Sequence, residues 1–379
     1  MNKSLLILVS HLSFFISHRM ELALAAKNMG YKVKVAFGEL DADIKHLADR
    51  GIDNFHVPIQ RGGTNIIKDI KSLYYIWRLF RKVRPDIVHL VTIKPYLYGG
   101  VVARLSNVPC VVSAVSGLGS IFIHKDFASR IIRSLLKPIY HFAFNHSNQS
   151  VIVQNEADAN VLVEWGVLKS QKIKLLKGSG VKIQNFTQLK ELDEIPKVCF
   201  AARLINDKGI YDFVSAAHLL IERGVKAKFY LAGDLDVKNP TGLNINDLNY
   251  LKEDDNIEIL GYQKDIPTLY AKSHIVSLPS YREGLPKALM EAAAASRAVV
   301  TTDVPGCRDA IIPNKTGLLV PLKNPKKLAD AIQWLIENPH DRIAMGRAGR
   351  KLAEKEFRIE KIIQEHLDIY KELLININI

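Results

Sequence analysis

Cysteine is scarce in this sequence. The three cysteines, Cys110, Cys199 and Cys307, stand far apart among 379 residues. A small, odd and dispersed set excludes a disulfide framework and lacks the close pairs of a zinc cluster. We therefore expect a protein of a reducing compartment.

Long apolar runs are missing as well. Near the N-terminus, the run Leu5–Val9 covers only a few residues before Ser10 and His11 interrupt it. This run is short for the core of a signal peptide and far below the roughly 20 residues that span a bilayer. The sequence therefore predicts a soluble, cytoplasmic protein.

Acidic residues are few in the first half of the chain. Residues 1–180 contain 24 Lys and Arg against 12 Asp and Glu, whereas the remainder contains 28 against 27. Nearly all of the net charge of +13 thus lies in the first half. This asymmetry predicts an anionic partner for that half, and nucleic acid and an acidic membrane face are the two candidates.

Short β-branched runs alternate with helical stretches throughout, which is typical of βαβ units and a parallel sheet covered on both faces. Gly, Asn, Pro and mixed charges interrupt this pattern in "KGSGVKIQNFTQLKELDEIPK", where we place a linker around residues 181–195. The sequence thus predicts an α/β protein of two doubly wound, Rossmann-like domains that face a central cleft, over residues 1–185 and 190–358. A final helix over 359–379 is expected to pack back on the first domain. Ligands of such open sheets bind at the carboxyl ends of the strands.

The individual elements follow from the same pattern. Strands are expected in the first domain at 5–9, 32–37, 87–91, 110–113 and 150–153, with helices at 18–29, 66–84, 96–106, 128–146 and 156–165. Strands are expected in the second domain at 198–202, 228–232, 257–260, 274–278, 298–301 and 317–320.

Two cations follow the first strand of the second domain, in "CFAARLINDKGI". Arg203 stands at the end of the strand, and Lys208 is expected on the first turn of the next helix. Paired cations beside a helix N-terminus favour a phosphate or diphosphate. The alternative is that Arg203 pairs with a local carboxylate such as Asp207 and that Lys208 is solvated.

Two glutamates eight residues apart flank a Gly-Leu-Pro break in "SYREGLPKALMEAAAAS". Glu283 is expected in a loop that points into the cleft, and Pro286 suits the first position of the helix that follows. Glu291 lies in that helix between apolar neighbours, so it is expected to be partly buried and to need donors, which ligand hydroxyls could supply. The alternative is a structural salt bridge for Glu291 and an ordinary exposed Glu283.

The first domain offers fewer candidates. We expect its first strand to end at Ser10, with a loop to His18 in which Ser10 and His11 supply hydrogen bonds at the predicted crevice. The turn "SAVSGLGS" allows a ligand to approach the backbone near Gly117. A structural role for His11 is the alternative.

Taken together, "RLINDKG", the Glu-x7-Glu of "REGLPKALME" and "VVTTDVPGCRDAIIPNKTGLLVP" resemble the retaining glycosyltransferases of family 4, which have the GT-B architecture. The resemblance covers essentially the whole chain. In the first domain, "LVSH", "SGLGSIFI" and "KGSGV" resemble a narrower group of bacterial enzymes that act on polyprenyl-diphosphate-linked glycans, such as the diacetylbacillosaminyl-diphospho-undecaprenol N-acetylgalactosaminyltransferases.

The resemblance implies an enzyme that moves a hexose or N-acetylhexosamine from a UDP-sugar to a lipid-linked saccharide in cell-surface polysaccharide or glycan assembly. The resemblance also implies that this enzyme needs no metal ion and no cofactor. Arg203 and Lys208 would hold the donor diphosphate and stabilise the leaving charge. Glu283 would contact the transferred sugar and Glu291 the ribose. The remaining donor contacts would come from Gly284, Leu285 and the neighbours of Pro286 for the sugar and phosphate, and from Gly261, Tyr262 and Gln263 for the nucleobase.

The sequence departs from the family pattern at two places. "SHLSFFIS" replaces a glycine-rich loop after the first strand, and "SGLGS" replaces a His-Asp pair, with His124 and Asp126 arriving later. "AGDLDV" contains Asp234-Leu235-Asp236, a motif that holds a divalent metal in another transferase fold, but this family has a turn near the donor there. Asp303 and Asp309 flank the next loop, with no role that the resemblance fixes.

Two helices of the first domain are basic and amphipathic: "NIIKDIKSLYYIWRLFRKVR" and "DFASRIIRSLLKPIYHFAFNH". Such helices are typical of membrane-surface binding. The alternative is that their apolar stripes face the sheet. A lipid-linked acceptor favours peripheral attachment to the anionic inner face of the cell membrane. Nucleic acid is disfavoured because no nucleic-acid module is recognised. A nucleotide-sugar 2-epimerase and a non-catalytic sugar-nucleotide sensor remain as alternatives.

Overall fold

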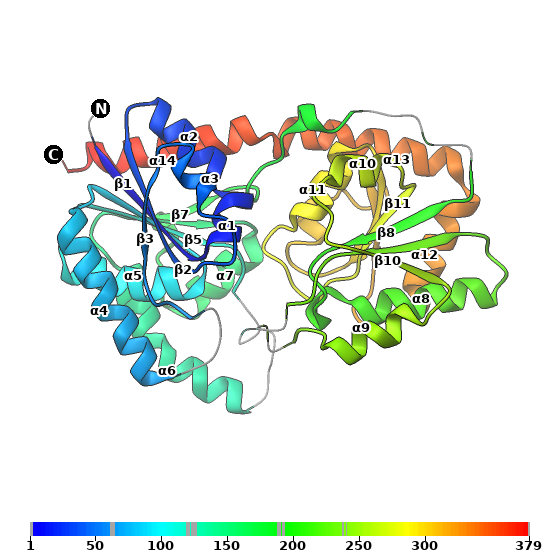
Figure 1. Cartoon of the computed structure of the whole chain (residues 1–379), viewed down its shortest axis with the longest axis horizontal. Coiled ribbons are helices and arrows are strands. Elements are labelled where there is room, and N and C mark those ends of the chain that lie inside the picture. The colour runs from blue at the N-terminus through cyan, green and yellow to red at the C-terminus, as the bar shows by residue number, and fades with distance from the viewer. Residues whose placement is uncertain are drawn as a thin grey trace. The chain divides into compact units, whose positions relative to one another are not determined.

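The structure is a computed structural model that describes residues 3–60, 65–118, 122, 127–187, 191, 194–236, 239 and 241–377. The chain divides into two compact units (Figure 1). The first comprises residues 1–179 together with 362–379, and the second comprises residues 180–361.

The first unit is built on a seven-stranded parallel sheet with the order β3-β2-β1-β4-β5-β6-β7. Its strands are β1 (Ser4–His11), β2 (Lys32–Glu39), β3 (Asp53–His56), β4 (Ile87–Val91), β5 (Cys110–Val115), β6 (Gln149–Val153) and β7 (Ile173–Leu175). Its helices are α1 (Leu12–His18), α2 (Met20–Asn28), α3 (Lys45–Ala48), α4 (Ile66–Val83), α5 (Ile93–Leu105), α6 (Phe127–Phe144), α7 (Glu156–Glu164) and the part of α14 (Ile359–Ile375) from residue 362 onward.

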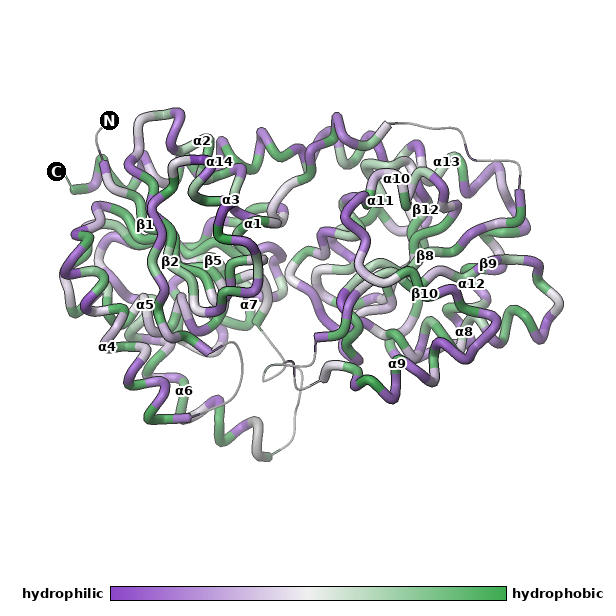
Figure 2. Tube along the Cα trace, in the orientation of Figure 1, coloured by the Kyte–Doolittle hydropathy of each residue, from purple (hydrophilic) through white to green (hydrophobic). Residues whose placement is uncertain are grey.

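Helices cover both faces of this sheet, and the side chains of β1 are therefore buried on both sides of the strand. Leu5, Ile7 and Val9 enter one apolar core, and Leu6 and Leu8 enter the other. The strand is therefore continuously apolar instead of alternating, as expected for a strand that is buried on both faces. Figure 2 shows the same concentration of apolar residues along the inner strands.

The two edge strands, β3 and β7, were not predicted from the sequence. Each pairs with a single neighbour, β2 or β6. An edge strand is covered less completely than a central one, so "DNFH" and "IKL" carry no buried apolar run that would mark them.

The expected loop between Ser10 and His18 is wrong. Strand β1 continues to His11, and helix α1 begins immediately at Leu12. Leu12 and Phe15, three residues apart, are both buried, so a helical turn buries both side chains where a loop would not. The helical path breaks at Arg19 and resumes as α2.

A buried polar group joins α14 to the first sheet. His89 of β4 is hydrogen-bonded to the Tyr370 hydroxyl, and its ring stacks on His366 with 5.5 Å between centroids. Burial lowers the pKa of both imidazoles, and the nearby Arg19 charge lowers them further; the pKa of His366 falls to about 3. Both rings are thus neutral in the folded protein.

This pair makes stability depend on pH. Below the ordinary histidine pKa of about 6.5, the unfolded chain binds protons that the folded chain does not, so the free energy of unfolding decreases as the pH falls. We expect His366 alone to contribute a decrease of about 1.4 kcal/mol per pH unit below about pH 6, down to its folded pKa. Urea unfolding of His366→Gln between pH 7.5 and 5 should show a shallower pH slope than the parent. The matched change His340→Gln, on an exposed histidine, should leave the slope as it is; equal slopes for all three proteins would contradict the prediction.

The second unit contains a six-stranded parallel sheet with the order β10-β9-β8-β11-β12-β13. Its strands are β8 (Lys197–Ala201), β9 (Lys228–Ala232), β10 (Ile257–Gly261), β11 (Ile275–Leu278), β12 (Ala298–Thr302) and β13 (Gly317–Val320). Its helices are α8 (Ile210–Glu222), α9 (Ile245–Lys252), α10 (Ile266–Ala271), α11 (Lys287–Ala294), α12 (Pro325–Glu337) and α13 (Pro339–Leu352), followed by a π-helical turn at Ala353–Phe357. Strands β8 and β11 are neighbours, so the loops at their carboxyl ends meet.

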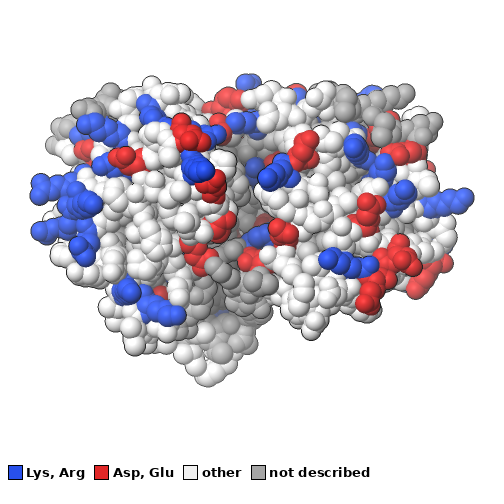
Figure 3. Space-filling view, in the orientation of Figure 1, with Lys and Arg blue, Asp and Glu red and all other residues white. Residues whose placement is uncertain are grey.

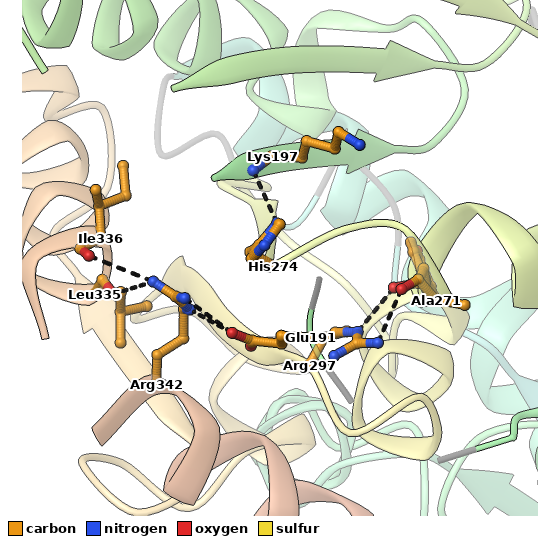
Figure 4. A network of polar contacts seen from close by, with 9 residues as sticks. Glu191, Lys197, Ala271, His274, Arg297, Leu335, Ile336 and Arg342 are labelled. Atoms are coloured by element: carbon orange, nitrogen blue, oxygen red, sulfur yellow. Dashed lines mark hydrogen bonds and ion pairs between the residues drawn. The ribbon is translucent and has the colours of Figure 1, made fainter. Parts of the chain in front are cut away.

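Two buried arginines form hydrogen bonds between separate segments of this unit (Figure 4). Two nitrogens of Arg342 donate to one oxygen of Glu191, at 2.8 and 3.0 Å, and a third donates to the Leu335 carbonyl. Arg297, almost fully buried, donates to the carbonyls of Tyr270 and Ala271. These arginines satisfy carbonyls at the ends of helices α12 and α10 that would otherwise lose their hydrogen bonds.

Candidate functional site

Arg203 follows β8 and forms an ion pair with Asp236. A backbone bridge between Leu204 and Leu235 holds the two loops in register. Asp236 is buried, whereas about half of the Arg203 side chain remains exposed. The alternative partner considered from the sequence was Asp207, but the partner is the last residue of the Asp-Leu-Asp motif. This carboxylate, which in another transferase fold belongs to a metal-binding motif, is here a counter-ion for Arg203.

Lys208 forms an ion pair with Glu283, and both side chains are mostly buried. Lys208 ends a single 3-10 turn, Asn206–Lys208, so it precedes helix α8. The sequence-based prediction that Lys208 lies on the first turn of that helix is wrong. The Ser280 hydroxyl lies 2.7 Å from Glu283 Oε1 and 2.9 Å from the Asp207 carbonyl oxygen, two acceptors for its one proton. Since Tyr281 N also donates to the Asp207 carbonyl, the β8 and β11 loops are locked together.

Two glycines make this close packing possible. Gly209 has a φ of 75°, and a Cβ there would overlap the carbonyl of Pro279. Gly306 has a φ of 82°, and a Cβ there would overlap the Glu283 carbonyl. Both positions need a left-handed backbone and an absent side chain, which only glycine supplies at no cost.

Hydrogen bonds to the loop after β12 hold the backbone of Glu283 in place. The Glu283 amide donates to the Pro305 carbonyl, at 3.2 Å, and the Gly306 amide donates to Asp309 at 2.9 Å. Asp303, the other acid that the sequence singled out, accepts a hydrogen bond from Arg308 at 2.7 Å. Asp309 thus anchors the loop that fixes Glu283, and Asp303 anchors its neighbouring arginine.

Helix α11 starts one residue later than predicted. Pro286 is its N-cap, with an extended ψ of 122°, and Lys287 is its first residue. Leu289 N and Met290 N both donate to the Pro286 carbonyl, so the first turn is closed. Gly284 and Leu285 are buried just before the helix. The positive end of the helix dipole therefore lies beside Glu283.

Glu291 is mostly buried in α11, as predicted, and has a cationic neighbour one turn earlier. Lys287 Nζ lies 3.3 Å from Glu291 Oε1. Burial raises the pKa of the Glu291 carboxyl, and Lys287 opposes that shift. The salt bridge that the sequence left as an alternative is therefore present, and the carboxylate keeps acceptor capacity beyond that single contact.

The turn after β10 leaves an aromatic ring in solvent. The Tyr262 side chain is about two-thirds exposed, with 65% relative accessibility. Gln263 Nε2 donates to the Leu260 carbonyl at 2.7 Å, which fixes the turn.

In the first unit, Ser10 is buried at the end of β1 and lies 2.5 Å, hydroxyl to hydroxyl, from Thr92. Thr92 has a φ of 75° and a ψ of 163°, a conformation that is costly for a residue other than glycine. His11 is buried next to the Phe14 ring. Gly117 has a φ of 128°. His124 and Asp126 lie outside the described residues.

Sequence reasoning missed Ser280, Gly306 and the pairing of Asp236. No spacing along the sequence marks these contacts; they follow from strand order in the folded sheet, where β9 and β11 flank β8 and residues just after these three strands converge. Among the described residues, no group of three or more His, Cys, Asp and Glu side chains is arranged to hold a metal ion.

Two family models match the chain. Residues 181–352 match the model described as "Glycosyl transferases group 1", and residues 4–155 match "Glycosyl transferase 4-like". Together they cover every strand described above except β7.

Curated relatives and a solved structure agree with these matches. The chain is 28% identical to the N,N'-diacetylbacillosaminyl-diphospho-undecaprenol alpha-1,3-N-acetylgalactosaminyltransferase of Campylobacter jejuni, over 97% of this chain and 99% of that protein. It is 25% identical to the UDP-Gal:alpha-D-GlcNAc-diphosphoundecaprenol alpha-1,3-galactosyltransferase of Escherichia coli, over 86% of each. Its fold is similar to that of Anabaena HepE in complex with UDP and glucose, with a TM-score of 0.77 at 15% identity, over 98% of this chain and 100% of that one.

Proposed function

Because the chain belongs to the GT-B glycosyltransferases, with a 4-like first domain and a group 1 second domain, we propose that it transfers a sugar from a UDP-sugar to a polyprenyl-diphosphate-linked saccharide, with retention of configuration. The transferred sugar is an N-acetylhexosamine or a hexose. The names of two relatives support the acceptor class, and UDP is named for one relative and in the HepE complex.

The observation that carries the proposal is two ion pairs in the loops after β8, β9 and β11. Arg203 and Lys208, both after β8, pair with Asp236 after β9 and with Glu283 just before α11. When the bond between the sugar C1 and the diphosphate breaks, its electron pair goes to the β-phosphate oxygen. Two fixed cations stabilise that charge without reorganisation, so this arrangement lowers the barrier with no metal ion.

Glu283 and Glu291 would bind different parts of the donor, the transferred sugar and the nucleoside. Glu283, held by Lys208 and Ser280, would accept hydrogen bonds from hydroxyls of the transferred sugar. Glu291 would accept from the ribose hydroxyls, and the exposed ring of Tyr262 would frame the base. The buried backbone at Gly284, Leu285 and Pro286 would lie against the sugar and phosphate.

The acceptor side belongs to the first unit. We place Ser10, His11 and Gly117 in acceptor binding because they lie at the carboxyl ends of β1 and β5, where open sheets bind ligands. The lipid anchor of such an acceptor would bring the enzyme to the cytoplasmic face of the membrane as a peripheral protein. None of the described helices is both long and apolar enough to cross a bilayer.

A donor screen tests the proposal. UDP release from a panel of UDP-sugars would be measured with and without a polyprenyl-diphosphate-linked saccharide, together with the mass of the lipid product. The expected result is UDP release that depends on the acceptor and a lipid product heavier by one sugar. Acceptor-independent UDP release with a rearranged free sugar would indicate the epimerase, and binding without turnover would indicate the sensor; either outcome overturns the proposal.

Gly306→Ala is expected to lower kcat/KM by about 100-fold, because a displacement of roughly 1 Å in a positioned group can cost that much. The added Cβ would overlap the carbonyls of Glu283 and Gly284 and shift both. Initial rates of UDP release with saturating acceptor would measure the effect.

Gly224→Ala is the matched control. Gly224 has a φ of 75°, close to that of Gly306, but a Cβ there meets no atom within 4 Å. Both substitutions therefore carry similar backbone strain, and only one of them moves Glu283. Equal rates for the two variants would show that the packing of Gly306 on Glu283 has no part in turnover.

A further inference from the structure

Helix α4 carries two apolar stripes on opposite sides. One stripe, made of Ile76, Leu79 and Phe80, is buried against the first sheet. The other consists of Ile66, Ile70, Tyr74 and Trp77, at spacings of three and four residues, and it is exposed, with Ile67 beside it. Ile67 is 80% exposed and Ile70 is 60% exposed. The sheet accounts for the first stripe, so packing on the sheet does not explain the second.

The exposed side of α4 changes character along the helix. Aliphatic residues come first, at 66, 67 and 70, and the aromatic residues Tyr74, Tyr75 and Trp77 follow. Arg78 and Arg81 then lie over the rings of Tyr74 and Trp77, with 5.9 and 5.4 Å from the guanidinium carbon to the ring centroid. The exposed side thus presents isoleucines with Lys68 and Lys71 among them, then aromatic rings, then guanidinium groups.

The charge on this helix is almost entirely positive. Six cations belong to it or cap its end: Lys68, Lys71, Arg78, Arg81, Lys82 and Arg84. Its one acid, Asp69, is paired with Lys94 at 2.9 Å. Figure 3 shows basic side chains gathered over α4 at the edge of the first unit. An anionic surface is therefore the complementary partner.

The order of residue types matches the depth profile of a bilayer leaflet, in which hydrocarbon lies deepest, aromatic rings occupy the interface and cations meet the headgroups. A nucleic acid would use the cations but offers nothing to three exposed isoleucines. We infer that α4 enters an anionic lipid surface obliquely, with its first turn at Ile66–Ile70 deepest, its aromatic residues at the interface and its C-terminal cations among the headgroups. This deepens the peripheral attachment proposed above, but it stands on the surface of α4 alone.

The depth of single α4 residues in the bilayer can be measured with a dye attached to an introduced cysteine. Cys110, Cys199 and Cys307 are all buried, so the introduced thiol is the one that reacts with the dye. Ile67→Cys, Tyr74→Cys and Arg81→Cys would each be labelled with an environment-sensitive dye and mixed with vesicles of equal parts phosphatidylcholine and phosphatidylglycerol. Quenching by lipids brominated deep in the chain should be strongest at 67, weaker at 74 and weakest at 81. Equal quenching at the three positions would overturn the oblique entry, and no quenching at any of them would overturn lipid contact.

Affinity for the same vesicles supplies the second readout. Ile66→Ser/Ile67→Ser/Ile70→Ser should weaken binding on the order of 1,000-fold, because burial of each isoleucine in lipid is worth about tenfold. Leu105→Ser/Ile245→Ser/Ile375→Ser, which removes three exposed aliphatic side chains elsewhere, should leave the affinity unchanged. If an α6 variant, Phe127→Ser/Ile131→Ser/Leu135→Ser, loses affinity while the α4 variant does not, α4 is not the insertion element. If the α4 variant instead abolishes self-association in a vesicle-free solution, a second copy of the chain is the partner and the lipid inference fails.

Vesicle binding requires neither donor nor acceptor, so its failure leaves the proposed transfer reaction standing. Conversely, turnover with a detergent-solubilised acceptor should be the same for the α4 triple variant and the parent. A loss of turnover there would show that α4 acts in catalysis and not in lipid contact.

Discussion

Lys208→Met is expected to lower kcat by about 100- to 1,000-fold, the usual cost of removing one preorganised group that stabilises developing negative charge. The methionine side chain fills a similar volume but leaves the leaving diphosphate with Arg203 as its remaining cation from this pair. Since the charge develops as the C1–oxygen bond breaks, the effect should fall mainly on kcat and less on KM for the donor. Steady-state UDP release at saturating acceptor would separate the two constants.

The control for this experiment must separate catalysis from folding, because Lys208 also neutralises the mostly buried Glu283. Lys208→Met alone leaves that carboxylate without its cation and should lower the melting temperature. Lys208→Met/Glu283→Gln removes both charges and should recover much of the stability while remaining inactive. A double variant with parent-like kcat would show that neither side chain takes part in the reaction.

Arg342→Met is expected to lower the free energy of unfolding by about 3–5 kcal/mol, the typical cost of breaking a buried ion pair from one side. The substitution strands the buried Glu191 carboxylate and removes the donor to the Leu335 carbonyl at the end of α12. Urea unfolding followed by circular dichroism would measure the change, with the slope checked for constancy.

Glu191→Leu/Arg342→Met is the informative comparison. It replaces both charges by apolar groups of similar size, so it should cost far less than Arg342→Met alone. Arg223→Met serves as the surface control, because Arg223 pairs with Asp330 where both side chains are about one-third exposed, and such pairs are worth about 0–1 kcal/mol. Equal losses for Arg342→Met and Arg223→Met would show that burial does not decide the strength of the Arg342 pair.

The central strands and most helices of the fold could be predicted from the sequence. Strands β4, β9 and β13 have the predicted boundaries, and α14 begins at the predicted residue 359. The GT-B fold and the glycosyltransferase class are confirmed by the family and structure matches. Central strands are readable because burial on both faces leaves an uninterrupted apolar run, whereas the edge strands β3 and β7 carry no such signal.

The site was only partly predictable. Arg203, Lys208, Glu283 and Glu291 were proposed as site residues because charged residues just beyond a buried strand, or within an apolar helix, are unusual enough to need a reason. Their partners were not found, since ion pairing depends on which loops meet. Asp236 and Arg203 are separated by 33 residues, and Lys208 and Glu283 by 75.

The sequence by itself determined the alternation of strands and helices, the unequal charge of the two halves and the residue types at the strand ends, because these follow from periodicity and composition along the chain. Only the tertiary structure decided that Asp236 serves Arg203, that Gly306 lies against Glu283 and that one stripe of α4 is left uncovered. Each of these is a contact, or a missing contact, between segments distant in sequence. The order of strands in the sheets fixes such contacts, and residue spacing along the chain does not encode that order.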